Sequence, residues 1–257
     1  HGPSALYLGG AHQAAAFRSL QGGEWHDTAT TPIDTSMPYL VKLPSGRTIA
    51  VFFYNGDVSQ AIAFRGLLNS GEALADGLLG GLPRDGERPQ LSHVATDGET
   101  YGHHHRHGEM ALAYALHHIE RAGLARITVY GEFLALHPPT HEAQIVEQSS
   151  WSCAHGVERW RSDCGCHTGG ASGWNQAWRG PLRHALDWLY HQVTATWEKA
   201  AAAHLHQPWQ ARDAYIAVIN DPNETTIARF MATHARTTAR YPALALLELQ
   251  RQLMQSY

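Results

Sequence analysis

The chain has 257 residues, 44% of them hydrophobic, and a formal net charge of −4 with histidine neutral. This is enough apolar material for one large domain or two smaller ones, and no apolar stretch is long enough to span a bilayer. The basic residues are scattered and form no stripe, which argues against a nucleic-acid surface. We therefore expect neither a nucleic-acid nor a membrane partner.

Three cysteines, Cys153, Cys164 and Cys166, lie within 14 residues of one another. An odd number confined to so short a stretch argues against a secreted disulfide framework. We expect a cytoplasmic protein, and no signal peptide is recognisable. Because the first residue is His1 and not methionine, we also expect that an upstream segment has been removed or left out.

The N-terminal half alternates strand-like and helix-like segments. The predicted strands are residues 5–8, 47–54, 91–96 and 127–130. A first helix is capped by Asp57 or Ser59 and carries Ile62, Leu67 and Leu68. A second helix covers about residues 106–122 and ends at Gly123, with apolar positions that include Met110, Leu112, Leu116 and Ile119. This alternation indicates parallel α/β units.

The remaining chain divides into an irregular segment and a helical one. Residues 138–180 are rich in Trp, Cys, His and Gly without a sustained period, which indicates an ordered functional loop or a metal-organised segment. Beyond Pro181 an apolar stripe is formed by Leu182, Leu186, Leu189 and Val193. Trp188 and Trp197 are expected in the core. Further helices are predicted at residues 209–219, 224–235 and 242–254, and the predicted domains are residues 1–137, 138–180 and 181–257.

The segment between residues 91 and 109 carries the clearest chemical pattern. Its strand delivers Asp97 and Glu99 at the carboxyl end, where α/β folds place their ligand sites. Glycines allow tight turns there, and His103, His104, His105 and His107 follow directly before a helix. Carboxylates beside imidazoles suit proton transfer or metal binding. A cap or turn for Asp97, and structural roles for most of the histidines, stay open as alternatives.

The run Asp97-Gly-Glu-Thr-Tyr-Gly-His103 resembles the fourth signature segment of glycoside hydrolase family 57, and the resemblance extends over about residues 39–188. It implies part of a distorted (β/α)7-type barrel followed by a C-terminal helical domain, hence an α/β fold. It also implies retaining hydrolysis or glucanosyl transfer on α-glucans, with Asp97 as the general acid/base and no cofactor needed for this chemistry.

A retaining enzyme needs a second carboxyl group as nucleophile, about 5–5.5 Å from the first. The family carries this glutamate on an earlier strand, and Glu24, Glu72 and Glu87 lack that context. The early His-Gln-Pro segment of the family is not found either. We therefore expect the nucleophile upstream of this chain, with the missing N-terminal portion or a homo-oligomeric partner covering an open sheet edge.

Candidates for sugar binding come from several segments. They are Glu99, His103, His104, Glu132, Trp151 and Trp160. Glu132 follows the predicted strand at residues 127–130, and its alternative role is structural. The two tryptophans are the preferred platforms for sugar rings, with packing as the alternative for each.

The cysteine segment suggests a second kind of site. Cys153, Cys164, Cys166 and His167 are the candidate ligands of a zinc or iron ion, although Cys-x-Cys is not the usual zinc spacing. His155 forms a further Cys-x-His pair with Cys153. Reduced cysteines that pack a glycine-rich loop, or a nucleophilic cysteine, are the alternatives.

Two other functions stay open at this point. In one, Asp97, His103 and His104 hold a divalent cation that activates water in a hydrolase or deacetylase. In the other, the chain is a non-catalytic module with a Cys/His metal centre.

Overall fold

The computed structural model of the protein describes residues 6–82, 88–150, 152–166, 170–236, 238 and 240–256. The chain divides into two compact units, residues 1–157 and 158–257, and each is described by itself. Among the described residues, no helix combines the length and the apolar character that a bilayer crossing requires. The predicted domain boundaries after residues 137 and 180 stay predictions.

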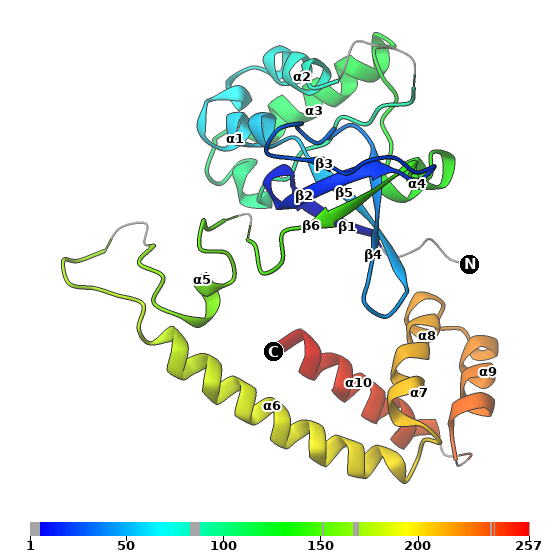
Figure 1. Cartoon of the computed structure of the whole chain (residues 1–257). Helices are drawn as coiled ribbons and strands as arrows, with labels where there is room; N and C mark the ends of the chain where they lie inside the picture. Colours follow the sequence, from blue (N-terminus) through cyan, green and yellow to red (C-terminus); the bar gives the residue numbers. More distant parts are fainter. Residues whose placement is uncertain are drawn as a thin grey trace. The chain divides into compact units, whose positions relative to one another are not determined.

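A six-stranded mixed sheet forms the first unit (Figure 1). Its strands are β1 (Leu6–Gly10), β2 (Ala14–Ser19), β3 (His26–Asp27), β4 (Pro38–Lys42), β5 (Thr48–Tyr54) and β6 (His141–Ile145). The spatial order is β1-β5-β4-β6-β2-β3. β1 with β5 and β4 with β6 are parallel pairs, and the other neighbours are antiparallel.

β5 carries a nearly continuous run of apolar side chains, which is typical of a strand that is covered on both faces, and its residues from Ala50 to Phe53 are buried. On one face Val51 and Phe53 pack with Tyr39 and Val41 of β4. On the other face the Phe52 ring meets the Tyr130 ring, with their centroids 4.9 Å apart. The centre of the sheet therefore anchors both apolar layers of this unit.

Four helices accompany the sheet, and Figure 1 shows the first three gathered together. They are α1 (Gly56–Phe64), α2 (Gly71–Gly80), α3 (Gly108–Arg121) and α4 (Tyr130–Leu136), with the 3-10 turns η1 (Ala11–Gln13), η2 (Leu67–Asn69) and η3 (Gly98–Thr100). Asn55 caps α1 by accepting a hydrogen bond from the Val58 amide, so the predicted cap at Asp57 or Ser59 is wrong by two residues or more. Ile62, Leu74 and Ile119 form the core among α1, α2 and α3.

The second unit is helical in the part that the structure describes. Its helices are α5 (Glu158–Arg161), α6 (Arg179–Ala202), α7 (Pro208–Ala214), α8 (Ile216–Asn220), α9 (Glu224–His234) and α10 (Arg240–Ser256). Trp197 lies in its core with Leu205, Phe230 and Leu247. The indole N–H of Trp197 donates to the Leu246 carbonyl over 2.7 Å. This core is built around the C-terminal third of α6.

Many of the predicted elements are confirmed. The strands at residues 5–8 and 47–54 are β1 and β5, the helix at residues 106–122 is α3, and α9 and α10 match the last two predicted helices. The predicted helix at residues 209–219 is divided into α7 and α8 at Tyr215. The strands β2, β4 and β6 were not predicted.

The predicted strands at residues 91–96 and 127–130 are wrong. The Leu91 amide bonds to the Ser36 carbonyl over 2.8 Å, and the Ala95 amide bonds to the Ser59 hydroxyl over 3.1 Å. Loop and side-chain acceptors thus occupy backbone groups that a strand ladder would use, and the second segment leads into α4. The expected α/β class is confirmed, but the described residues form an open sheet and no closed barrel.

The predicted apolar stripe of α6 is exposed along most of its length. Leu182, Leu189 and Val193 are 49%, 48% and 39% exposed, and Trp188 is 64% exposed, so its expected core position is wrong. Only Trp197, at 5%, lies in the core as expected. The reason is that the apolar core of the helical unit packs against the C-terminal end of α6, at Trp197 and Ala201, and does not include its N-terminal residues.

Trp197→Ala tests this placement against Trp188→Ala, the same change on the same helix. We expect Trp197→Ala to lower the free energy of unfolding of the helical unit by about 3–5 kcal/mol, because it opens a cavity in a packed core. Trp188→Ala should change it by less than about 0.5 kcal/mol. Chemical denaturation followed by circular dichroism measures both, and equal losses would contradict the assignment.

Candidate functional site

The loop from Asp97 to Gly108 connects the extended segment at residues 91–96 to the start of α3. Asp97 has extended backbone angles and precedes η3, and its carbonyl accepts the Thr100 amide over 3.1 Å. Among the described residues, the Asp97 carboxylate caps no amide of this turn. The side chain is exposed, so the carboxyl group projects from a turn that the backbone holds.

Several interactions fix this loop against the helical layer. The Gly102 amide bonds to the His105 carbonyl over 3.0 Å, and the His105 Nε2–H donates to the Ala63 carbonyl over 2.8 Å. Gly102 has a φ of +106°, which favours glycine. Gly108 is buried, and a Cβ there would lie 3.1 Å from the Leu68 side chain. A bulky residue at either glycine would disturb the loop.

The predicted residues of this segment are accessible to solvent. Asp97, Glu99, His103 and His104 are all exposed, and the His103 and His104 rings lie edge to face with centroids 4.9 Å apart. His105, in contrast, is held by the Ala63 carbonyl. The alternative of structural histidines therefore applies to His105, while the roles assigned to the exposed residues stay predictions.

Glu132 lies in the first turn of α4 and not at the end of a strand. The Thr128 hydroxyl donates to its Oε2 over 2.6 Å, and Arg126 forms an ion pair with its Oε1. The hydrogen bond from Thr128, and then that from Arg126, lower the pKa of Glu132. These contacts support the structural role that was the alternative to sugar binding.

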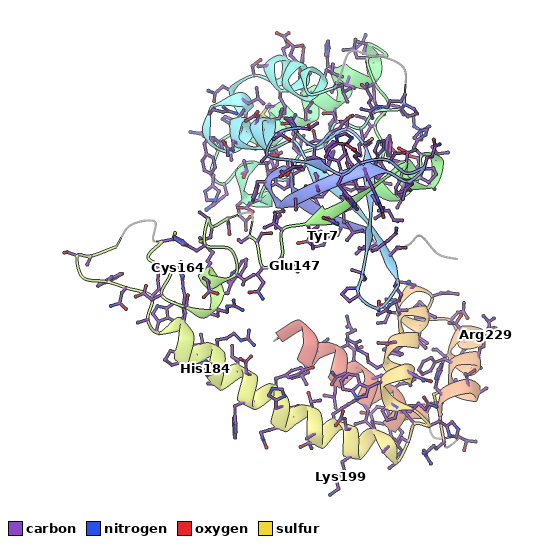
Figure 2. All side chains as sticks on the ribbon, in the orientation of Figure 1. Tyr7, Glu147, Cys164, His184, Lys199 and Arg229 are labelled. Carbon is purple, nitrogen blue, oxygen red and sulfur yellow. The ribbon has the colours of Figure 1, made fainter. Side chains whose placement is uncertain are left out.

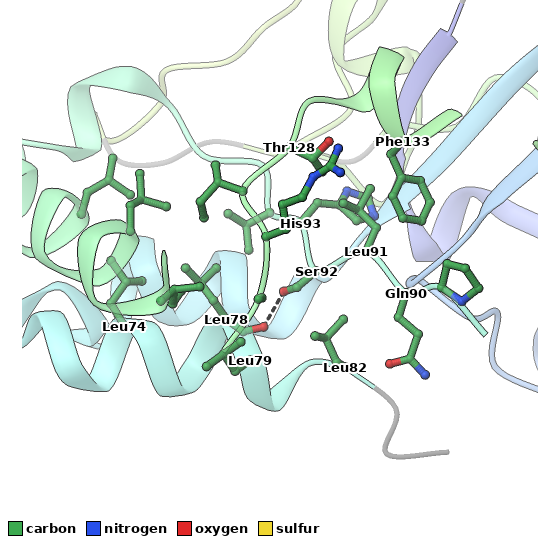
Figure 3. A pocket seen from close by; sticks show the side chains of 18 of the residues that line it. Leu74, Leu78, Leu79, Leu82, Gln90, Leu91, Ser92, His93, Thr128 and Phe133 are labelled. Atoms are coloured by element: carbon green, nitrogen blue, oxygen red, sulfur yellow. Dashed lines mark hydrogen bonds between the residues drawn. The ribbon is translucent and has the colours of Figure 1, made fainter. Parts of the chain in front are cut away.

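An apolar cavity of about 530 Å³ lies in the first unit (Figure 3). Figure 3 shows Leu74, Leu78 and Leu79 of α2 along one wall, with Phe133 of α4 on another. None of the predicted catalytic or sugar-binding residues lines this cavity. Apolar surface predominates in its lining, so the cavity suits an apolar group better than a sugar ring.

His93 is a buried polar residue at the wall of this cavity that the sequence analysis did not single out. Its Nε2 lies 2.9 Å from the Thr35 carbonyl, which can only accept, so Nε2 carries the proton. Nδ1 then accepts from the Tyr130 hydroxyl over 3.0 Å. Burial lowers the pKa of His93, and the ring is a neutral link between the loop at Thr35 and α4.

Glu142, the second residue of β6, is another buried polar residue that was not predicted. Arg18 Nε donates to its Oε1 over 2.6 Å, and Lys42 Nζ lies 2.6 Å from its Oε2. The hydrogen bond from Lys42 is the main cause that lowers the pKa of Glu142; burial opposes it and Arg18 adds to it. This carboxylate holds β2, β4 and β6 together and has no oxygen left for catalysis.

Two tryptophans, Trp151 and Trp160, are the predicted sugar platforms. Trp160 lies on α5 and is 54% exposed, which leaves its ring open to a ligand. Trp151 lies outside the described residues.

The three cysteines come together in the irregular segment that precedes α6, where Figure 2 shows Cys164. Cys153, His155, Cys164 and Cys166 have potential ligand atoms that all lie within 4.8 Å of one another. None of the three cysteines is in a disulfide. The predicted ligand His167 lies outside the described residues. The segment therefore contains a Cys₃His cluster that could bind a metal ion, with His155 as its fourth member.

Asp97, His103 and His104 do not form a comparable cluster. Among the described residues, the potential ligand atoms of three or more residues converge in the Cys₃His group and in no other place. The alternative in which these three residues hold a catalytic cation is therefore not supported by the geometry.

Glu142→Gln tests the buried ion-pair cluster. We expect it to lower the free energy of unfolding by about 1–3 kcal/mol at neutral pH, because it leaves Arg18 and Lys42 without their charged partner. A carboxylate with a lowered pKa stabilises the fold above its unfolded pKa, and this contribution is lost as the pH falls through the folded pKa. The difference between variant and wild type should therefore shrink in acid, as urea denaturation at several pH values would show.

Glu132→Gln is the matched control, since this carboxylate also pairs with an arginine but is exposed. Exposed pairs contribute little, so its effect should be much smaller. Equal effects of the two substitutions, or a Glu142→Gln difference that persists unchanged in acid, would contradict the role assigned to Glu142.

Comparison with known proteins shows which families the chain matches. A family model described as glycosyl hydrolase family 57 matches residues 14–146, which include the loop at Asp97. A second model, described as a domain of unknown function (DUF3536), matches residues 174–257. Neither curated proteins nor solved structures give a match. The first match covers more than half of the 257 residues, and the chain therefore belongs to glycosyl hydrolase family 57.

Proposed function

We propose that this protein is a retaining α-glucan hydrolase or glucanosyltransferase in which Asp97 is the general acid/base. Membership of glycosyl hydrolase family 57 is the observation that carries the proposal. It is supported by the exposed carboxyl group of Asp97 at the head of the run Asp97-Gly-Glu-Thr-Tyr-Gly-His103.

The chemistry assigned to Asp97 consists of two proton transfers. Its protonated carboxyl group gives a proton to the glycosidic oxygen as the bond to the sugar breaks, and a nucleophilic carboxylate forms the glycosyl-enzyme ester. Asp97, now ionised, then takes a proton from water or from the acceptor hydroxyl that releases the sugar. Water gives hydrolysis and a sugar hydroxyl gives transfer. Asp97 is assigned as the acid/base, and no residue of this chain is assigned as the nucleophile.

The loop suits this task because its backbone is fixed while its side chains are exposed. The Thr100 amide holds the Asp97 carbonyl, and the Thr96 and Tyr101 hydroxyls lie 3.0 Å apart, so residues on either side of Asp97 are tied to each other. A catalytic group on a fixed backbone loses little freedom when substrate binds. Glu99, His103 and His104 are assigned to sugar hydroxyls.

The alternatives have less support. A divalent-cation hydrolase would need ligands at Asp97, His103 and His104 that converge, and the described residues show no such convergence. The Cys₃His cluster is compatible with a non-catalytic module, but the family of the first unit favours an enzyme. Trp160 stays a prediction as a sugar platform.

Asp97→Asn in the full-length protein should lower kcat on a maltooligosaccharide by about 10²–10⁴-fold, because the amide cannot donate the proton to the leaving oxygen. On a glucoside whose leaving group departs without protonation, the loss in kcat/KM should be much smaller, because kcat/KM reports the first step; kcat should still fall, because Asp97 is also the base of the second step. Steady-state kinetics on both substrates measure the difference.

Asp76→Asn is the control for this experiment, since Asp76 is an exposed aspartate on α2. It should leave kcat within a few fold of wild type. Turnover by Asp97→Asn within a few fold of wild type on the maltooligosaccharide would disprove the assignment.

His104→Ala tests the binding role of the loop. Loss of a hydrogen bond to a sugar hydroxyl should raise KM by roughly 2–10-fold with a smaller effect on kcat. His117→Ala, an exposed histidine on α3, should leave KM unchanged. A fall in kcat at constant KM would instead give His104 a role in the chemical step.

A further inference from the structure

We propose that Cys153, His155, Cys164 and Cys166 bind one zinc ion that organises the segment before α6. The site goes beyond the glycosidase function and does not depend on it. It lies at residues 153–166, outside both stretches that the family models match, so neither match accounts for these residues.

The distances suit a four-coordinate ion. In a tetrahedral site with Zn–S near ~2.3 Å and Zn–N near ~2.0 Å, neighbouring ligand atoms are roughly 3.5–3.8 Å apart. Cys153 Sγ and His155 Nδ1 are 3.8 Å apart, and all four ligand atoms lie within 4.8 Å of one another. The side chains therefore need to move little to close around an ion.

Two tight turns present the ligands, and each depends on a glycine. Gly156 has a φ of +62°, and a Cβ there would lie 2.1 Å from the Gln148 carbonyl oxygen, so no other residue fits after His155. Its amide closes the turn by bonding to the Cys153 carbonyl over 3.0 Å. Gly165 has a φ of +76° and lies between Cys164 and Cys166. A left-handed residue there allows a Cys-x-Cys pair, with one residue fewer than usual, to direct both thiols to one point.

Residues near the start of α6 supply the outer contacts that metal sites use to hold their ligands. The Arg179 guanidinium donates to Cys164 Sγ over 3.6 Å, and the Gln176 side chain donates to the Cys166 carbonyl. A nearby guanidinium favours the thiolate form that binds metal. Three thiolates, a neutral imidazole and Zn²⁺ carry a net charge of −1, and Arg179 offsets it.

The donor set selects zinc among the common metals. Thiolate and imidazole donors suit zinc, whereas calcium and magnesium prefer oxygen ligands. Four protein ligands fill a tetrahedral shell and leave no position for water, which is the pattern of structural zinc sites. Within the described residues, the segment from 152 to 166 has one short helix, α5. A metal cross-link would supply the order that secondary structure provides elsewhere.

Metal analysis of the tag-free, full-length protein, prepared in zinc-supplemented medium without chelators, tests the proposal. We expect one zinc per chain in the wild type, and cobalt exchanged into the site should show the thiolate charge-transfer and tetrahedral d–d bands. Cys164→Ser and His155→Ala should lose the zinc. Arg179→Ala should retain it with about 10–100-fold lower affinity in a competition with a chromophoric chelator.

Two further histidine variants complete the experiment. His184→Ala removes an exposed histidine of α6 and should retain one zinc. His167→Ala removes the histidine that the sequence alone suggested, so its zinc content compared with that of His155→Ala tests which histidine is the ligand. The wild-type cobalt spectrum keeps the test valid if a cysteine variant fails to fold.

A folded wild type without zinc, a stoichiometric iron centre, or a disulfide between these cysteines in the native protein would each overturn the proposal. Zinc lost from His167→Ala but kept by His155→Ala would overturn the assignment of His155. None of these outcomes bears on Asp97, so this proposal and the glycosidase proposal can fail separately.

Discussion

The hydrogen bond between the His105 imidazole and the Ala63 carbonyl ties the loop of Asp97 to the helical layer of the first unit. It spans 42 residues of chain, and the buried Gly108 makes a second attachment by packing against Leu68. Because the loop has one 3-10 turn and no longer element of its own, these contacts decide where the exposed carboxyl group stands. The chemistry proposed for this family member depends on that position.

The first unit shows what local patterns predict and what they do not. β5 was predicted because seven neighbouring residues are β-branched, aromatic or small, so the signal lies within the strand itself. β6, with the sequence His-Glu-Ala-Gln-Ile, carries no such signal. Its glutamate is buried with Arg18 and Lys42, which reach it from β2 and β4. A strand that depends on partners about 100 residues away cannot be predicted from its own residues.

The candidate sites follow the same distinction. The residues from Asp97 to His104 are contiguous, so the sequence alone could point to them as one segment, but the strand that was predicted to precede Asp97 is absent. The Cys₃His cluster was predicted in its three cysteines, but the histidine predicted with them was His167, which lies outside the described residues. The turn closed by Gly156 brings His155 to the thiols, and such a turn is visible only in three dimensions. His93 was missed because nothing in the sequence around it gives a sign of the Thr35 carbonyl that holds it.

The close pair of indoles in the helical unit has a consequence for spectroscopy. The Trp197 and Trp209 rings have centroids 4.9 Å apart, close enough for their electronic transitions to couple. The other tryptophans among the described residues are 37–75% exposed and emit from a water-like environment. The coupled pair thus gives the helical unit an intrinsic optical probe, whose near-ultraviolet dichroism reports on that core without any added dye.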